Sequence, residues 1–230
     1  MFKSLSLGLS DTFSRPLRAV MLRSLGLSLM LLALMGVGAF YGLEWIPPVG
    51  AEWGFPFIDT VIDWLSGAIV IVVMVLLLMP VSALFAGLFL EEVAGAVETR
   101  HYPEETAGRD QPFVQGLWIA LKFTALLIVL NLIALPLYFI PIVNIVTYWG
   151  LNGYLLGREY FELVALRHRR PNDARTLRRQ KSFSVFFAGV GVAALASIPV
   201  LNLLTPFFAT AMMVHLHKRF SESPRPEKLG

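Results

Sequence analysis

The chain has 230 residues, of which 56% are hydrophobic and only 15% are charged, and its formal net charge is +3. A composition this apolar excludes an ordinary soluble domain and predicts an integral membrane protein. Cysteine is absent, which excludes disulfides, thiolate metal sites and cysteine nucleophiles. The basic residues gather beside apolar segments, a pattern typical of contact with membrane lipids rather than with nucleic acid.

The first part of the chain predicts two spanning helices. Residues 1–15 place apolar side chains three to four positions apart, which indicates a short interfacial helix. Residues 20–43 form an apolar stretch longer than the roughly 20 residues needed to cross a bilayer. We expect this stretch to stay in the protein as the first spanning helix rather than to be cleaved as a signal peptide. Residues 44–63 carry acidic side chains but no Lys or Arg, which places them on the translocated side. Residues 64–90 are the second predicted spanning helix, with a kink at Pro80.

Two helical hairpins are expected to follow, over residues 113–166 and 182–219. The first has an apex without charge, which indicates a loop at membrane depth, and the second has arms too short for a core about 30 Å thick. Residues 167–181 contain seven Lys or Arg and should be cytoplasmic. The polar tail, residues 221–230, is expected to be disordered. The expected fold is an all-α integral membrane protein with one membrane domain over residues 1–220, having two long transmembrane helices, two partly penetrating hairpins and both termini in the cytoplasm.

One phrase occurs twice within these apolar segments. Residues 140–147 read IPIVNIVT and residues 198–205 read IPVLNLLT, with Ile, Pro, Asn and Thr at the same positions. Proline interrupts a helix and asparagine favours turns, so the two phrases predict hairpin apexes rather than two unrelated kinks. The apex residues would be Pro141, Asn144, Pro199 and Asn202.

A candidate anion site lies at the start of the first spanning helix, where Arg15, Arg18 and Arg23 are close in sequence. A helix N-terminus presents free N–H groups and a partial positive charge, and arginine adds forked donors that match an oxyanion. The alternative is that these arginines are ordinary cytoplasmic anchors of the helix.

Charged residues at two other places are candidates for lining or gating a pathway. Arg158, Glu159 and Glu162 lie near the end of the first hairpin, at spacings that allow Arg158 and Glu162 to pair. Glu91 and Glu92 end the second spanning helix and could form a ring in an oligomer or pair with the arginines. The alternative for both groups is solvated positions where helices leave the membrane.

The histidines show no metal-ligand spacing, so neither a metal site nor a cofactor is expected. His101, His168, His215 and His217 all fall in segments expected to be cytoplasmic, and the His-x-His pair lies beside Lys218. Nucleotide-binding glycine loops, zincin motifs and serine-nucleophile motifs are also absent from the sequence. We therefore do not expect an enzyme.

The order of these segments resembles the family shared by CysZ-type sulfate permeases and the etoposide-induced 2.4 proteins. The resemblance runs through SRPLRAVMLRSLGLSLML, LFAGLFLEEVAGAVE and IPVLNLLTPFFATAMMVHL, and its most specific part is GREYFELVALRHR at residues 157–169. In this family the anion site is a Gly-Leu-Arg motif at the start of the first long helix, followed by another arginine. Pro16, Leu17 and Arg18 stand at the matching positions, and Ala19 stands where the next arginine would be. Arg18 therefore carries over, and Arg15 or Arg23 would supply the second charge.

The resemblance implies a permease of the bacterial inner membrane that admits sulfate for cysteine biosynthesis and works as a homo-oligomer. With no energy-coupling motif in the sequence, we expect passive or weakly coupled, channel-like passage. The alternative function is a membrane scaffold or membrane-shaping protein whose hairpins wedge into one leaflet without transporting an anion.

Overall fold

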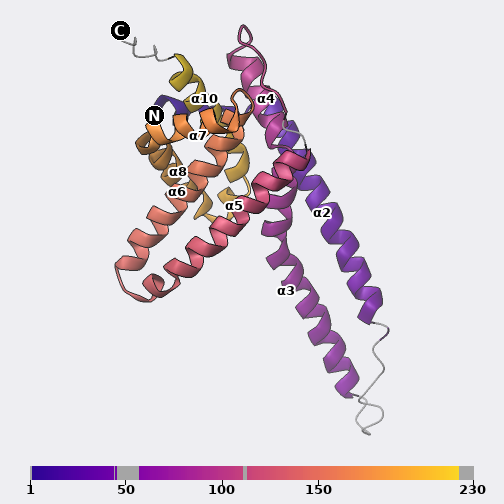
Figure 1. Ribbon diagram of the computed structural model, residues 1–230. Coiled ribbons are helices and arrows are strands. Elements are labelled where there is room, and N and C mark those ends of the chain that lie inside the picture. The colour runs from indigo at the N-terminus through magenta and orange to yellow at the C-terminus, as the bar shows by residue number, and fades with distance from the viewer. Residues whose placement is uncertain (1, 44, 46–56, 111–112, 223–230) are drawn as a thin grey trace, which may run out of the picture. The chain divides into compact units, whose positions relative to one another are not determined.

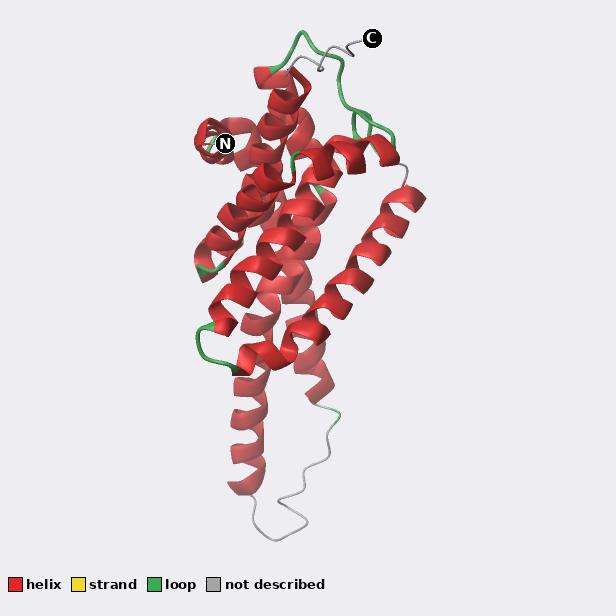
Figure 2. Ribbon diagram, turned by 60° about the vertical axis from the view of Figure 1, so that its left-hand side comes forward, coloured by secondary structure: helices red, strands yellow, loops and turns green. Residues whose placement is uncertain are grey.

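The computed structural model describes residues 2–43, 45, 57–110 and 113–222 of the chain. These residues form helices joined by turns and loops, and contain no strand (Figure 2). The elements in chain order are α1 (Phe2–Thr12), α2 (Arg15–Leu43), α3 (Phe57–Leu88), α4 (Leu90–His101), α5 (Phe113–Ala134), the 3-10 helix η1 (Leu135–Phe139), α6 (Val143–Leu166), α7 (Pro171–Gln180), α8 (Ser182–Ala196), α9 (Pro199–Asn202) and α10 (Thr205–Glu222). The all-α class predicted from the sequence is confirmed.

Three segments in the described residues are long and apolar enough to cross a membrane: Arg15–Leu43, Phe57–Leu88 and Leu121–Phe139. Their large apolar side chains are mostly exposed, as expected of helices that face lipid. The chain is therefore a membrane protein. How many segments cross, and how deep each hairpin reaches, stays a prediction.

Several boundaries differ from the sequence prediction. The first long helix begins at Arg15 rather than at residue 20, and the second begins at Phe57, so Asp59 and Asp63 are helical. The second helix ends at Leu88, because the N–H of Phe89 bonds to the carbonyl of Ala86, three residues earlier, and α4 follows as a separate helix.

The basic segment, residues 167–181, and the end of the chain are also more helical than the sequence predicts. Residues 171–180 form α7, with Pro171 in its first turn, a position where the fixed φ of proline suits a helix start. Helix α10 continues to Glu222, so the start of the expected tail is helical, and residues 223–230 lie outside the described residues. Most of the predicted loop 44–63 also lies outside them.

The chain divides into two compact units, Met21–Phe89 and the remainder. The first holds most of α2 together with α3. In the second, α10 is the central helix, since its residues from Thr205 to Lys218 are almost all buried. The N-terminal helix α1 packs closely on α10, because a side chain at Gly8 would lie 2.8 Å from the backbone of Met212. The single membrane domain expected over residues 1–220 stays a prediction.

The two copies of the repeated phrase make the same local backbone structure. Ile140 and Ile198, each before a proline, have extended backbones with ψ of 117° and 113°. The N–H of Asn144 bonds to the carbonyl of Ile140 at 3.1 Å, and that of Asn202 bonds to the carbonyl of Ile198 at 2.8 Å. The first copy also has a positive φ of 70° at Ile142, where α5 and α6 meet at a bend and diverge from it (Figure 1).

Candidate functional site

Glycines bring α6 and α8 into backbone contact and thereby form one wall of the candidate site. A side chain at Gly157 would lie 2.5 Å from the carbonyl oxygen of Val185, and one at Gly189 would lie 2.6 Å from the backbone nitrogen of Gly157. Small residues spaced four apart, here Gly153 and Gly157, allow such close approach of two helices in membrane proteins. The contact places the polar end of α6 beside the start of α8.

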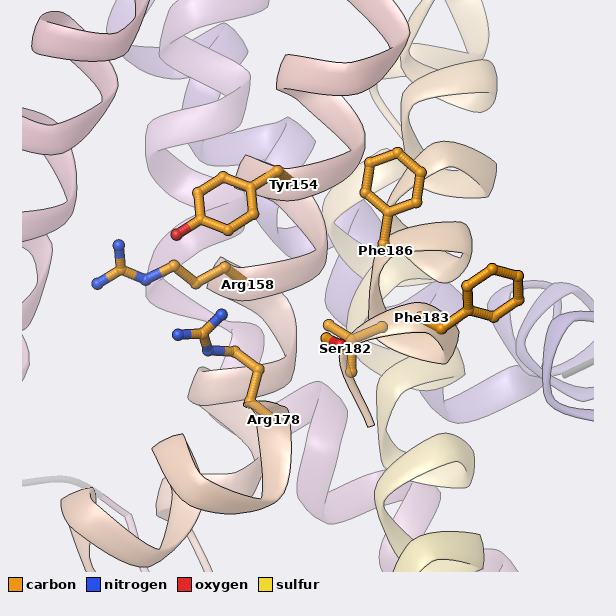
Figure 3. Close-up of a pocket in the computed structure, with 7 residues that line it drawn as sticks. Tyr154, Arg158, Arg178, Ser182, Phe183 and Phe186 are labelled. Carbon is orange, nitrogen blue, oxygen red and sulfur yellow. The ribbon is translucent and has the colours of Figure 1, made fainter. Parts of the chain in front are cut away.

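A pocket of about 290 Å³ lies at this end of the two helices, next to α7. Figure 3 shows the guanidinium groups of Arg158 and Arg178 extending to the same side as the Tyr154 hydroxyl, with two phenylalanine rings on the opposite side of the view. The lining residues are Tyr154, Arg158, Arg178, Ser182, Phe183, Val185 and Phe186. The open space is therefore bordered mainly by apolar surface, with two cations and two hydroxyl groups among its lining residues.

Both arginines of the pocket share one carboxylate oxygen. The Nε of Arg158 lies 3.4 Å from Oε1 of Glu162, and the Nε of Arg178 lies 2.8 Å from the same atom. Despite the short distance, the Arg178 contact is not a hydrogen bond, because its N–H is not directed at the oxygen. One carboxylate thus balances two guanidinium groups, and the local charge is net positive.

This arrangement can bind an oxyanion. Arginine presents planar, forked donors that match sulfate, phosphate or carboxylate oxygens, and it keeps its charge at any physiological pH. An arriving anion would compete with Glu162 for Arg178, whose present contact is poorly aligned. The hydroxyl groups of Tyr154 and Ser182 could donate to the remaining oxygens.

The arginines at the start of α2 are placed as follows. Arg15 and Arg18 are exposed, and the Nε of Arg18 donates to the carbonyl of Phe13 at 2.7 Å. The side chain of Leu17 is buried, and Arg23 is exposed in the Met21–Phe89 unit. Next to Arg15 in the sequence, the buried Oγ of Ser14 has no hydrogen-bond partner among the described residues. A helix start with a spare buried hydroxyl and two nearby arginines offers donors to an anion.

The glutamates predicted to line or gate a pathway lie in different environments. Glu162 joins the pocket, whereas Glu159 is a half-buried neighbour on α6 outside the lining residues. Glu91 is half-buried, with Oε2 at 3.7 Å from Nη1 of Arg167, and Glu92 is exposed. The ion pair expected between Arg158 and Glu162 is present.

A second polar cluster fastens the loop after α4 to the end of α6. The guanidinium of Arg167 is buried and contacts both oxygens of Glu98 at 3.3 Å and Oδ1 of Asp110 at 2.6 Å. The ring of His168 also lies 2.9 Å from Glu98. Burial alone would raise the pKa of Glu98, but the hydrogen bonds from His168 and Arg167 outweigh it and lower the pKa to about 2.

Sequence reasoning missed Arg178 and Ser182, which line the pocket. Arg178 belongs to a basic run whose pattern indicates only a cytoplasmic position. Once α7 is known to begin at Pro171, Arg178 falls in its last turn and can reach α6. The pocket also depends on Gly157 and Gly189, whose role appears only when α6 and α8 are seen in contact.

Comparison with known families decides the membership of the chain. Residues 4–206 match the family model described as sulfate transporter CysZ/etoposide-induced protein 2.4. The chain belongs to the CysZ/EI24 family. No curated protein sequence matches it. The family assignment confirms the resemblance stated from the sequence. A transporter family is a family of membrane proteins, which agrees with the three described segments that are long and apolar enough to cross a membrane.

Proposed function

We propose that this CysZ/EI24 family member lets sulfate cross the bacterial inner membrane into the cytoplasm, where it supplies cysteine biosynthesis. The observation that carries the proposal is the family match over residues 4–206. The passage is passive or weakly coupled and channel-like, because the sequence holds no motif for ATP hydrolysis or other energy coupling.

The arginine pocket supports this function by its chemistry. Sulfate would compete with the Glu162 carboxylate for the guanidinium groups of Arg158 and Arg178. Each arginine would then exchange one anionic partner for another, so neither would be left uncompensated. Glu159, Glu91 and Glu92 are proposed to line or gate the same route by repelling or admitting the anion.

The start of α2 is the second proposed sulfate contact. Arg18 and Arg15 would supply charge, Leu17 its backbone N–H, and Ser14 its unpartnered hydroxyl. Arg23 is proposed as a further cation on the same helix. The helix N-terminus adds a partial positive charge, which favours a dianion at this position.

The proposed setting is a homo-oligomer in the inner membrane, with both termini in the cytoplasm. The basic residues of α7 and of the chain ends support this orientation, since Lys and Arg concentrate on the cytoplasmic side. The membrane lipids surround the exposed apolar faces of α2, α3 and α5.

Sulfate flux into liposomes tests the function. We expect purified protein to admit radiolabelled sulfate, and Arg18→Ala and Arg178→Gln each to lower the initial rate about tenfold through the loss of a charged hydrogen bond. Arg179→Gln is the matched control for Arg178, because it removes the same charge from an exposed position of α7 and should leave the rate unchanged. Flux equal to that of empty liposomes would refute transport. Remodelled vesicles without flux would favour the scaffold function.

A further inference from the structure

Three side chains that are far apart in the sequence meet at the end of α1. Asp11 lies on α1, His101 on α4 and His215 on α10, and one ligand-type atom from each lies within 4.8 Å of the other two. We refer to these residues as the Asp11 cluster. Nothing in the transport proposal uses them.

The geometry of the cluster is well defined. The Nε2 of His101 lies 2.8 Å from Oδ1 of Asp11, and the Nε2 of His215 lies 2.7 Å from Oδ2. The side chains of Asp11 and His215 are 3% and 2% exposed, whereas that of His101 is 28% exposed. The cluster is thus buried on the side of α10 and open to solvent beside His101.

A hydrogen bond behind the cluster fixes the orientation of one ring. The Tyr102 hydroxyl lies 2.8 Å from Nδ1 of His215, on the side of the ring facing away from Asp11. Metal-bound histidines usually donate their second ring N–H to such a partner, which holds the ring in place and selects the tautomer that leaves the other nitrogen free for the metal. Tyr102 can accept this bond through its hydroxyl oxygen.

The donor set selects a class of ion. Two imidazole nitrogens and one carboxylate oxygen suit Zn²⁺ and neighbouring transition metals, whereas Mg²⁺ and Ca²⁺ prefer oxygen ligands. Zn²⁺ lies about 2.0–2.2 Å from such ligands, so ligand atoms around it are a little over 3 Å apart. The contacts of 2.8 and 2.7 Å would lengthen slightly, and ligand atoms that now lie up to 4.8 Å apart would move closer together. Arg100, whose Nη1 is 3.7 Å from Oδ1 of Asp11, is half-exposed and can turn into solvent.

We propose that Asp11, His101 and His215 bind one Zn²⁺ or similar transition-metal ion, with a fourth position open to water beside His101. The ion joins α1 to α4 and α10 and thereby stabilises the N-terminal helix against the core of its unit. No metal site was expected from the sequence, because the ligands come from three separate segments and show none of the usual ligand spacing.

Metal titration of the full-length protein without a polyhistidine tag tests the proposal. After treatment with a chelator, Co²⁺ should bind at one ion per chain with the visible spectrum of a nitrogen- and oxygen-ligated site, and Zn²⁺ should displace it. Asp11→Asn and His101→Gln should abolish binding, and Tyr102→Phe should weaken it by 10- to 100-fold. Zn²⁺ should also raise the unfolding temperature of the wild-type protein but not of Asp11→Asn or His101→Gln.

His168→Gln is the matched control, since it removes a partly buried histidine that binds Glu98 and lies outside the cluster. It should retain one Co²⁺ per chain. His101 is the most exposed of the three ligands, so His101→Gln should fold even if Asp11→Asn does not. Absence of saturable Co²⁺ binding by the wild-type protein, or undiminished binding by folded His101→Gln, would overturn the proposal.

Discussion

Arg167 illustrates how position in the chain and role in the structure can differ for a single residue. In the sequence it opens a basic run, and such runs are usually solvated faces on the cytoplasmic side. In the structure its guanidinium is 4% exposed and pairs with Glu98 and Asp110. A buried charge of this kind requires its partners, because an unpaired ion away from water is costly.

The residue-scale prediction concerns Glu98. Glu98→Gln should lower the free energy of unfolding by about 3 kcal/mol at neutral pH, since it leaves Arg167 buried with one carboxylate fewer. Thermal unfolding in detergent, followed by tryptophan fluorescence, measures this change. Glu104→Gln, at an exposed position in the loop after α4, should have no effect.

The lowered pKa of Glu98 also predicts that the stability of the protein depends on pH. The pKa of Glu98 falls from 4.5 to about 2 on folding, so its stabilising contribution is complete above pH 4.5 and is lost as the pH falls toward 2. Wild-type stability should therefore drop across this interval, and Glu98→Gln should drop less. Parallel curves for the two proteins would show that Glu98 does not carry this dependence.

At the scale of elements, the contact between α6 and α8 positions the arginine pocket. The glycines at this contact let backbone meet backbone, so the two helices have little freedom to shift when a side chain is added. The repeated Ile-Pro bends then set where the neighbouring helices turn back.

The element-scale prediction is a pair of glycine substitutions. Gly189→Ala should destabilise the unit by roughly 1–3 kcal/mol, because its methyl group would meet backbone atoms of Gly153 and Gly157 that cannot move aside. Gly150→Ala is the control on α6, since nothing lies within 4 Å of the added carbon. Unfolding temperatures in detergent compare the two variants, and equal values would refute the close contact.

At the scale of the whole molecule, membrane insertion rests on hydropathy and on the distribution of basic residues. Three described segments are apolar enough to cross, yet α8 has only 15 residues, about 22 Å of helix, which is short of a core of about 30 Å. The second hairpin should therefore enter only one leaflet.

Single-cysteine labelling tests this topology without background, because the chain has no native cysteine. Tyr138→Cys and Leu203→Cys, near the two bends, should resist a membrane-impermeant maleimide from either side. Arg175→Cys, on an exposed position of α7, should react from the cytoplasmic side only. Rapid reaction of the bend cysteines would show that the bends emerge into water and would contradict partial penetration.

Much of the architecture could be predicted from the sequence because its causes are local. Hydropathy over about 20 residues identifies apolar helices, and an Ile-Pro pair forces an extended residue wherever it stands. The pairing of Arg158 with Glu162 was predictable for the same reason, since both lie on one helix. The family was recognisable from segment order and the GREYFELVALRHR phrase.

The sequence by itself therefore determined that this is an all-helical membrane protein of a sulfate-transporter family, with bends at the two Ile-Pro phrases. Only the tertiary structure decided that Arg178 joins Glu162, that Glu98 neutralises Arg167, and that Asp11 meets two histidines. The physical reason is distance along the chain. Contacts between residues tens to hundreds of positions apart depend on which helix faces pack together, and small residues such as Gly189 decide that packing without any local signal.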